Sequence, residues 1–272
     1  MSTVFVGLEG GEFGTDVALS GDGLTAAFVD LSNNVFYVYT YTGATWVQIG
    51  DAIDPGPAAG DEIRIKLSHN GNVLLVGVPY AESSSSVGAG IVQMYTWNGT
   101  AWVKRGDELG GLLEKNYFGA DIALSSDGTR FIVGSPRDNG LVGEIYMYRW
   151  NGSAIVPVGY SIPGESVYDY FGTRVDISSL DGLTVAASGK YGNRQGKVLV
   201  YSFVDNAWVQ VGSTIVGAEY ESLGATGVKL SADGTTLAVS VTGFRYPING
   251  SGAARVYTLI NGDWAQLGAD IV

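Results

Sequence analysis

The chain repeats one pattern five times, and this repetition limits the possible folds more than any other feature of the sequence. Each copy begins with Phe-Gly or a related pair, continues with alternating apolar residues, and ends in a serine followed by a turn. A second pattern follows each copy: a tyrosine, a tryptophan seven positions later, and then a glycine. In the third copy Ile155 replaces the tryptophan. The serines of the five copies are Ser20, Ser68, Ser125, Ser178 and Ser231.

Each repeat reads as four short strands joined by tight turns. In the first repeat the expected strands cover residues 16–20, 25–29, 35–39 and 45–49, with apolar side chains at alternate positions. Asp-Gly and Asn-Gly pairs separate many of these strands, and such pairs suit turns that need a positive φ. The turns account for the glycine content, which is 41 of 272 residues. No helical periodicity of any length is present.

These units predict an all-β fold, a single five-bladed β-propeller with four antiparallel strands in each blade. Residues 1–272 then form one domain, because a ring of blades buries both faces of every sheet. Residues 1–12 are expected to close the ring. The repeats cover approximately residues 13–60, 61–117, 118–170, 171–222 and 223–272.

Charge and composition exclude several classes of function. Lys and Arg number 15 and Asp and Glu 27, for a net charge of −12, so we expect neither a nucleic-acid partner nor binding to anionic membranes. There is no cysteine and one histidine, which excludes thiolate chemistry and most metal centres. We therefore expect no enzyme, no cofactor and no metal site. No apolar run is long enough for membrane insertion, and the N-terminus does not resemble a signal peptide.

The repeats resemble the FG-GAP family, the integrin-α-like β-propellers. The Phe-Gly pairs are Phe13-Gly14, Phe118-Gly119 and Phe171-Gly172, and two strand ends approximate the Gly-Ala-Pro element, at residues 77–79 and 134–136. The corresponding segments 29–31, 188–190 and 240–242 depart from that element. Five repeats imply a smaller ring than the seven blades of integrins.

The resemblance implies recognition of a ligand and an extracellular or surface location. Calcium loops occur in many members of the family, but each corresponding turn here carries at most one carboxylate, so we expect no such site. A propeller of this type is expected to be a monomer. The sequence itself specifies neither the compartment nor the ligand.

Charged residues recur on the innermost strands, where their side chains are expected to line the central channel. Their signs alternate along the chain, which favours a salt-bridged plug that fixes the order of the blades. The alternatives are a polar ligand or ion site on the axis, or a glycosidase that uses Asp16, Asp121 and Asp176. The predicted channel residues are Asp16, Arg64, Lys66, Asp121, Arg174, Asp176 and Lys229.

Aromatic and basic residues that do not recur fall in the loops between strands two and three and between successive blades. Both sets of loops emerge on one face of a propeller, and such a surface suits protein or carbohydrate contact. The leading hypothesis is thus a non-enzymatic, adhesion-like or lectin-like recognition module. The alternatives are a structural component of a larger surface or particle protein, and a glycosidase-like enzyme. The predicted ligand-binding residues are Tyr80, Arg137, Tyr168, Tyr170, Tyr191, Arg194, Phe244, Arg245 and Tyr246.

Overall fold

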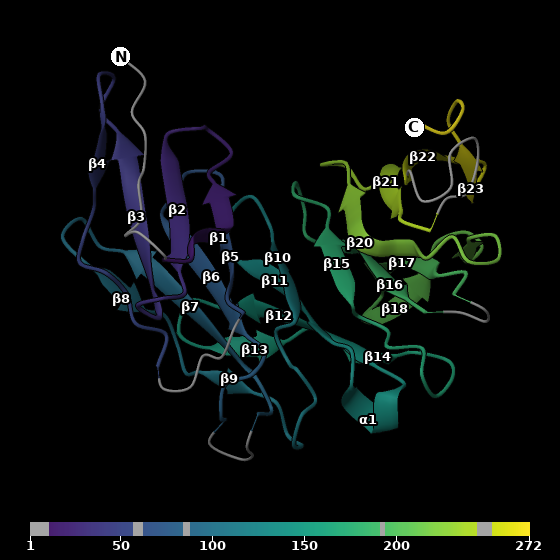
Figure 1. The fold of residues 1–272 in the computed structure, drawn as a ribbon, viewed down its shortest axis with the longest axis horizontal. Coiled ribbons are helices and arrows are strands. Elements are labelled where there is room, and N and C mark those ends of the chain that lie inside the picture. The colour runs from purple at the N-terminus through teal and green to yellow at the C-terminus, as the bar shows by residue number, and fades with distance from the viewer. Residues whose placement is uncertain (1–10, 57–61, 84–87, 191–193, 244–251) are drawn as a thin grey trace.

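The computed structural model describes residues 11–56, 62–83, 88–190, 194–243 and 252–272. These residues form five antiparallel sheets, one from each repeat, and one short helix (Figure 1). The prediction of an all-β, propeller-like fold is confirmed. The predicted ring-closing segment lies mostly in residues 1–10, outside the described residues.

The first two sheets come from the first two repeats. The strands of the first sheet are β1 (Phe13–Leu19), β2 (Thr25–Asp30), β3 (Val35–Tyr41) and β4 (Trp46–Gln48). Those of the second are β5 (Arg64–Leu67), β6 (Val73–Val78), β7 (Ile91–Trp97), β8 (Trp102–Lys104) and β9 (Leu109–Gly110).

The other three sheets follow the same order from inside to outside. The third has β10 (Asp121–Leu124), β11 (Arg130–Ser135), β12 (Glu144–Trp150), β13 (Ile155–Pro157) and β14 (Ile162–Pro163), with helix α1 (Asp138–Leu141) between β11 and β12. The fourth has β15 (Arg174–Ile177), β16 (Thr184–Gly189), β17 (Lys197–Val204), β18 (Ala207–Gln210) and β19 (Ile215–Val216). The fifth has β20 (Leu223–Leu230), β21 (Thr236–Val241), β22 (Ala253–Ile260) and β23 (Asp263–Gln266).

A short segment after the fourth strand returns to the third strand of the same sheet. It forms β9, β14 and β19 in the middle three sheets, which therefore have five strands rather than the four predicted. In the first and last sheets the same segment makes only isolated bridges, Ile53 to Phe36 and Ile271 to Ala254.

The recurring serine closes the turn between the first two strands of each sheet. In the third sheet Ser125 Oγ donates a hydrogen bond to Asp127 Oδ1 at 2.6 Å and accepts one from the Arg130 N–H at 2.9 Å. The other four turns have the same two hydrogen bonds, with Asn70 in place of the aspartate in the second sheet. The repeat is therefore built on one polar turn that satisfies its own backbone groups.

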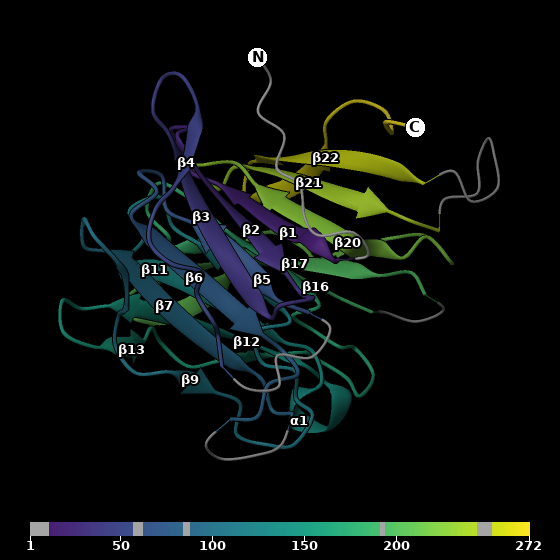
Figure 2. The same ribbon diagram turned by 60° about the vertical axis from the view of Figure 1, so that its left-hand side comes forward.

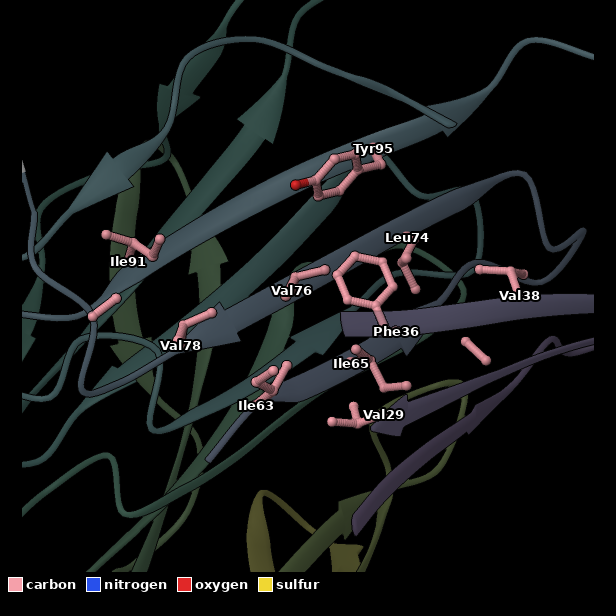
Figure 3. Packing of buried hydrophobic residues seen from close by; sticks show 12 residues of the cluster. Val29, Phe36, Val38, Ile63, Ile65, Leu74, Val76, Val78, Ile91 and Tyr95 are labelled. Atoms are coloured by element: carbon pink, nitrogen blue, oxygen red, sulfur yellow. The ribbon is translucent and has the colours of Figure 1, made fainter. Parts of the chain in front are cut away.

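Adjacent sheets pack through apolar side chains, one cluster at each of the four interfaces. Figure 3 shows the first cluster, in which Val29 and Phe36 of the first sheet lie close to Ile63 and Ile65 of the second. Because these side chains are almost fully buried, the interfaces supply most of the hydrophobic stabilisation of the fold.

The inner strands lie in the order β1, β5, β10, β15, β20, and each packs against the next. Backbone hydrogen bonds also join successive inner turns, from the Asp22 N–H to the His69 carbonyl at 3.0 Å and from the His69 N–H to the Ser126 carbonyl at 2.8 Å. Corresponding bonds join Ser126 to Ser179 and Leu180 to Ala232.

The five sheets make an open arc. The described parts of β20 and β1 share no interface comparable with the other four, and Figure 1 shows the first and last sheets apart at the two sides of the molecule. Figure 2 shows the same strands from a second direction, with the C-terminal end of the chain beside β22. The prediction of a closed five-bladed ring is therefore not confirmed.

The open arc predicts that the same substitution destabilises the protein by different amounts at two equivalent valines. Val175 is 1% exposed between the third and fourth sheets, whereas Val17 is 56% exposed at the free end of the arc. Val175→Ala should lower the free energy of unfolding by about 1–3 kcal/mol through the lost contacts and the cavity, and Val17→Ala by less than about 0.5 kcal/mol. Urea unfolding of dilute protein measures both. Equal losses would contradict the open arc.

Candidate functional site

The predicted channel residues mostly bond to backbone groups of the neighbouring sheet. We call the position of Asp16, Arg64, Asp121, Arg174 and Gly227 on the five inner strands the latch position. Asp16 Oδ2 accepts a hydrogen bond from the Ile65 N–H at 2.9 Å, and Asp121 Oδ2 accepts one from the Val175 N–H at 2.9 Å. Each aspartate thus holds the edge of the next inner strand.

The two arginines hold the same edge through the opposite backbone group. Arg64 Nε donates to the Ala120 carbonyl at 3.3 Å, and Arg174 Nε donates to the Thr226 carbonyl, also at 3.3 Å. A carbonyl and the N–H two residues later face the same side of an edge strand. An acid at the latch position can therefore use the N–H and a base can use the carbonyl, so residues of either sign can occupy the latch position.

Ion pairs between sheets are fewer than the alternating signs predict. Within the described residues, the predicted channel set contains one, in which Lys229 Nζ lies 2.9 Å from Asp176 Oδ1. Burial raises the pKa of Asp176, although Lys229 and two backbone N–H groups oppose this shift. Lys66 Nζ donates to the Ile65 carbonyl at 3.1 Å, and Arg64 pairs with Glu62 on its own sheet. Of these contacts, the Asp176–Lys229 pair joins two sheets and the others lie within the second repeat.

The predicted loop residues divide into two groups. Tyr80 packs edge-on against Tyr117 with ring centroids 4.8 Å apart, and the Arg137 guanidinium lies 4.3 Å from the centroid of the Tyr117 ring. Tyr168 and Tyr170 lie near Arg194, beside the fourth sheet. Four of the predicted residues, Tyr191, Phe244, Arg245 and Tyr246, lie outside the described residues.

The second group borders a two-part cleft, which we call the Lys190–Arg194 cleft. Its serine lobe lies between the fourth and fifth sheets, and its tyrosine lobe lies beside the loop that precedes β15. Its serine lobe has a volume of about 380 Å³ and its tyrosine lobe about 470 Å³. Lys190 and Arg194 line both lobes. The serine lobe is also lined by Thr173, Ser188, Gly189, Gly196, Ser222, Leu223 and Ala225, and the tyrosine lobe by Ser166, Val167, Tyr168, Asp169 and Tyr170.

Ser188 stands at a position where two other sheets have glycine. The equivalent residues in the second and third sheets are Gly77 and Gly134, where an added Cβ would lie only 2.6 and 2.1 Å from backbone carbonyls of the next sheet. At Ser188 the next sheet instead presents Gly224, where an added Cβ would lie 2.8 Å from the Ser188 Cβ. Residues 188–190 are one of the segments that depart from the Gly-Ala-Pro element in the sequence.

The Ser188 side chain is also polar, buried and without a partner. The residue is 1% exposed, and its Oγ has no hydrogen-bond partner in the described structure. The equivalent hydroxyl in the fifth sheet, Ser240 Oγ, accepts hydrogen bonds from the Thr226 and Gly227 N–H groups at 3.2 and 2.9 Å. Because buried hydroxyls are nearly always bonded, Ser188 is available to a molecule in the serine lobe.

Two basic residues, Lys190 and Arg194, line the same lobe as Ser188. Lys190 Nζ is 4.3 Å from the centroid of the Tyr170 ring, a cation–π contact that positions the amine. Within the described residues, no carboxylate lies within ion-pair distance of Lys190 or Arg194, although acidic residues greatly outnumber basic ones in the chain. The two side chains thus give the cleft a local positive charge.

The acidic residue of the cleft, Asp169, is already engaged. Its Oδ2 accepts hydrogen bonds from Lys197 Nζ at 2.7 Å and from the Glu165 and Ser166 N–H groups at 3.0 and 2.9 Å. Burial lowers the pKa of Lys197, but the bonds and charges of Asp169 and Glu165 outweigh burial and raise it. Asp169 therefore does not neutralise Lys190 or Arg194.

The described residues contain no group of three or more His, Cys, Asp or Glu side chains arranged to hold a metal ion. Within the same part of the chain, no helix is long and apolar enough to cross a membrane.

The comparisons with known proteins support the fold and no narrower family. No protein-family model and no curated protein sequence matches this chain. Membership of the FG-GAP family therefore stays a prediction.

Three solved structures match most of the chain. A "putative 6-phosphogluconolactonase" from Bacteroides fragilis is 13% identical, with 92% of this chain and 68% of that chain covered and a TM-score of 0.59. A second protein of that name, from Bacteroides uniformis, is 14% identical, with coverage of 94% and 71% and a TM-score of 0.61. TolB from Acinetobacter baumannii is 13% identical, with coverage of 96% and 56% and a TM-score of 0.52. This chain thus spans only about half to two thirds of their lengths.

These matches contradict the prediction of an adhesion-like or lectin-like recognition module, while the prediction that the chain is not an enzyme stays a prediction. Two of the similar structures carry the name of an enzyme that acts on a small phosphorylated molecule, and the comparisons give adhesion no support. The error came from transferring the integrin ligand face onto irregular loops. The described part of that face contains a local cleft with two cations.

The contrast between Ser188 and Ser240 predicts changes of opposite sign. Ser188→Ala removes a buried hydroxyl that has no partner, so the free energy of unfolding should rise by up to about 1 kcal/mol. Ser240→Ala removes the acceptor of two backbone N–H groups, so the free energy of unfolding should fall by about 1 kcal/mol. Thermal or urea unfolding of the ligand-free protein checks both. A loss at Ser188 equal to that at Ser240 would show that the Ser188 hydroxyl has a partner.

Proposed function

We propose that this propeller-like domain binds a small molecule with a phosphate or carboxylate group in the Lys190–Arg194 cleft. The observation that carries the proposal is that three hydrogen-bond donors line the same lobe. They are Lys190 and Arg194, which have no ion-pair partner among the described residues, and the buried Ser188 hydroxyl, which has no hydrogen-bond partner there. All three can donate hydrogen bonds, and an oxyanion accepts several at once.

The size of the cleft and its basic residues restrict the class of ligand further. The two lobes have volumes typical of sites for small molecules, and Tyr168 and Tyr170 offer ring surface next to the cations. A sugar acid or sugar phosphate would place its anionic group against the donors and its carbon skeleton along the rings. The net charge of −12 repels anions at long range, so binding depends on these local donors.

Binding can be measured by calorimetry with 6-phosphogluconate, gluconate and inorganic phosphate as probes. Lys190→Gln and Arg194→Gln should each weaken the binding of 6-phosphogluconate about tenfold or more, because a charged hydrogen bond contributes roughly 1.5–3 kcal/mol. Lys115→Gln is the matched control, since it removes the same charge from a side chain paired with Glu114 at 3.0 Å. Equal affinities for wild type, both cleft variants and the control would overturn the proposal.

Hydrolysis of a phosphorylated lactone is the second candidate function, favoured by the names of the two Bacteroides structures. Lys190 and Arg194 could polarise a lactone carbonyl as well as hold an anion. If so, the wild-type protein will hydrolyse 6-phosphogluconolactone faster than the spontaneous reaction, and Lys190→Gln will abolish the difference. Binding of 6-phosphogluconate without any acceleration would reject hydrolysis and leave the binding proposal standing.

A further inference from the structure

The four internal interfaces are built from one recurring pair of apolar positions. The first, the facing position, lies on the second strand of each sheet. The second, the receiving position, lies on the inner strand of the next sheet. The pairs Ala27 with Ile65, Leu75 with Ile122, Ile132 with Val175 and Ala186 with Val228 each belong to one core cluster. All eight side chains are at most 2% exposed.

The two ends of the arc carry the same positions without a neighbour. Ala238 occupies the facing position of the fifth sheet and is exposed, while Val17 occupies the receiving position of the first sheet and is 56% exposed. Leu19, two residues further along β1, is 61% exposed, whereas the equivalent Ile177 is 4% exposed. Among the described residues, the first sheet therefore lacks the neighbour that covers this position in every other sheet.

The backbone groups of the first and last inner turns are also complementary to each other. At each internal interface an inner turn donates an N–H to a carbonyl in the inner turn of the next sheet. Among the described residues, the Ala232 N–H in the last turn has no acceptor and the Gly21 carbonyl in the first turn has no donor. The last turn thus offers the hydrogen bond that the first turn lacks.

From this complementarity we infer that the fifth sheet of one molecule docks on the first sheet of a second copy of this chain. The second copy is the occupant for which the molecule itself supplies both faces, continuing an interface that it already contains four times. Closure within one molecule would bring together sheets that lie apart in Figure 1. It would also change the angles of interfaces that Gly77 and Gly134 hold in close backbone contact.

The contact between copies should be weaker than the internal interfaces. The latch position of the fifth sheet is Gly227, which has no side chain to hold the edge of the next inner strand. In the first sheet the Val17 N–H accordingly bonds to Asp16 Oδ1 of the same strand, at 3.0 Å. Association should therefore depend on protein concentration. Because the contact is head to tail, one free face of each kind remains after two copies join.

Two variants, each blocked at one end, test this arrangement. Val17→Asp places a charge on the receiving face and Ala238→Asp places one on the facing face. In analytical ultracentrifugation the wild type should exceed the monomer mass as concentration rises, and each variant alone should stay monomeric. An equimolar mixture should reach twice the monomer mass and no more, because only one compatible pair of faces remains.

A matched control separates this contact from general effects of charge. Val103 is 48% exposed on the outer strand β8, so Val103→Asp makes the same chemical change away from both faces and should associate like the wild type. Circular dichroism confirms that all variants keep the sheet content of the wild type. A wild type that stays monomeric at about 1 mM would overturn the inference, and so would a mixture that stays monomeric.

Discussion

The free edge of each innermost strand is the constraint on which the rest of the structure depends. Each inner strand pairs with one neighbour in its own sheet, so its other edge carries backbone groups that need partners. A side chain at the latch position of the preceding sheet supplies one, from Asp16, Arg64, Asp121 or Arg174. The edge is thus protected from pairing with another strand, and the order of the sheets is fixed.

Most of the fold could be predicted because the sequence pattern of one sheet recurs five times. The serine turns and the alternating strands are local features, and the same pattern in each copy indicates the same strands. Closure could not be predicted in this way. It depends on how neighbouring sheets pack, through contacts between residues distant in sequence, such as the approach of Gly134 to the backbone of Gly172.

The candidate site was predicted only in part. Tyr168, Tyr170 and Arg194 were selected because they do not recur, and the structure brings them to one cleft. Lys190 and Ser188 were missed because they lie at the end of a strand that otherwise follows the repeat. A signal was present: serine replaces glycine at a position where two earlier repeats need glycine for close packing. The effect of this replacement could not be predicted without the distance to the neighbouring sheet.

The open arc has a consequence for how this protein loses its structure. In the described part of the chain, the packing between sheets is between sheets adjacent in sequence, so the stability of the whole resembles that of a linear array of nearest-neighbour interactions. The fifth sheet has one such neighbour, and the serine lobe of the Lys190–Arg194 cleft lies in that single interface. A molecule bound there would bridge the last sheet to the rest of the array. Fraying of the chain from its C-terminal end and occupancy of the cleft are therefore one coupled equilibrium.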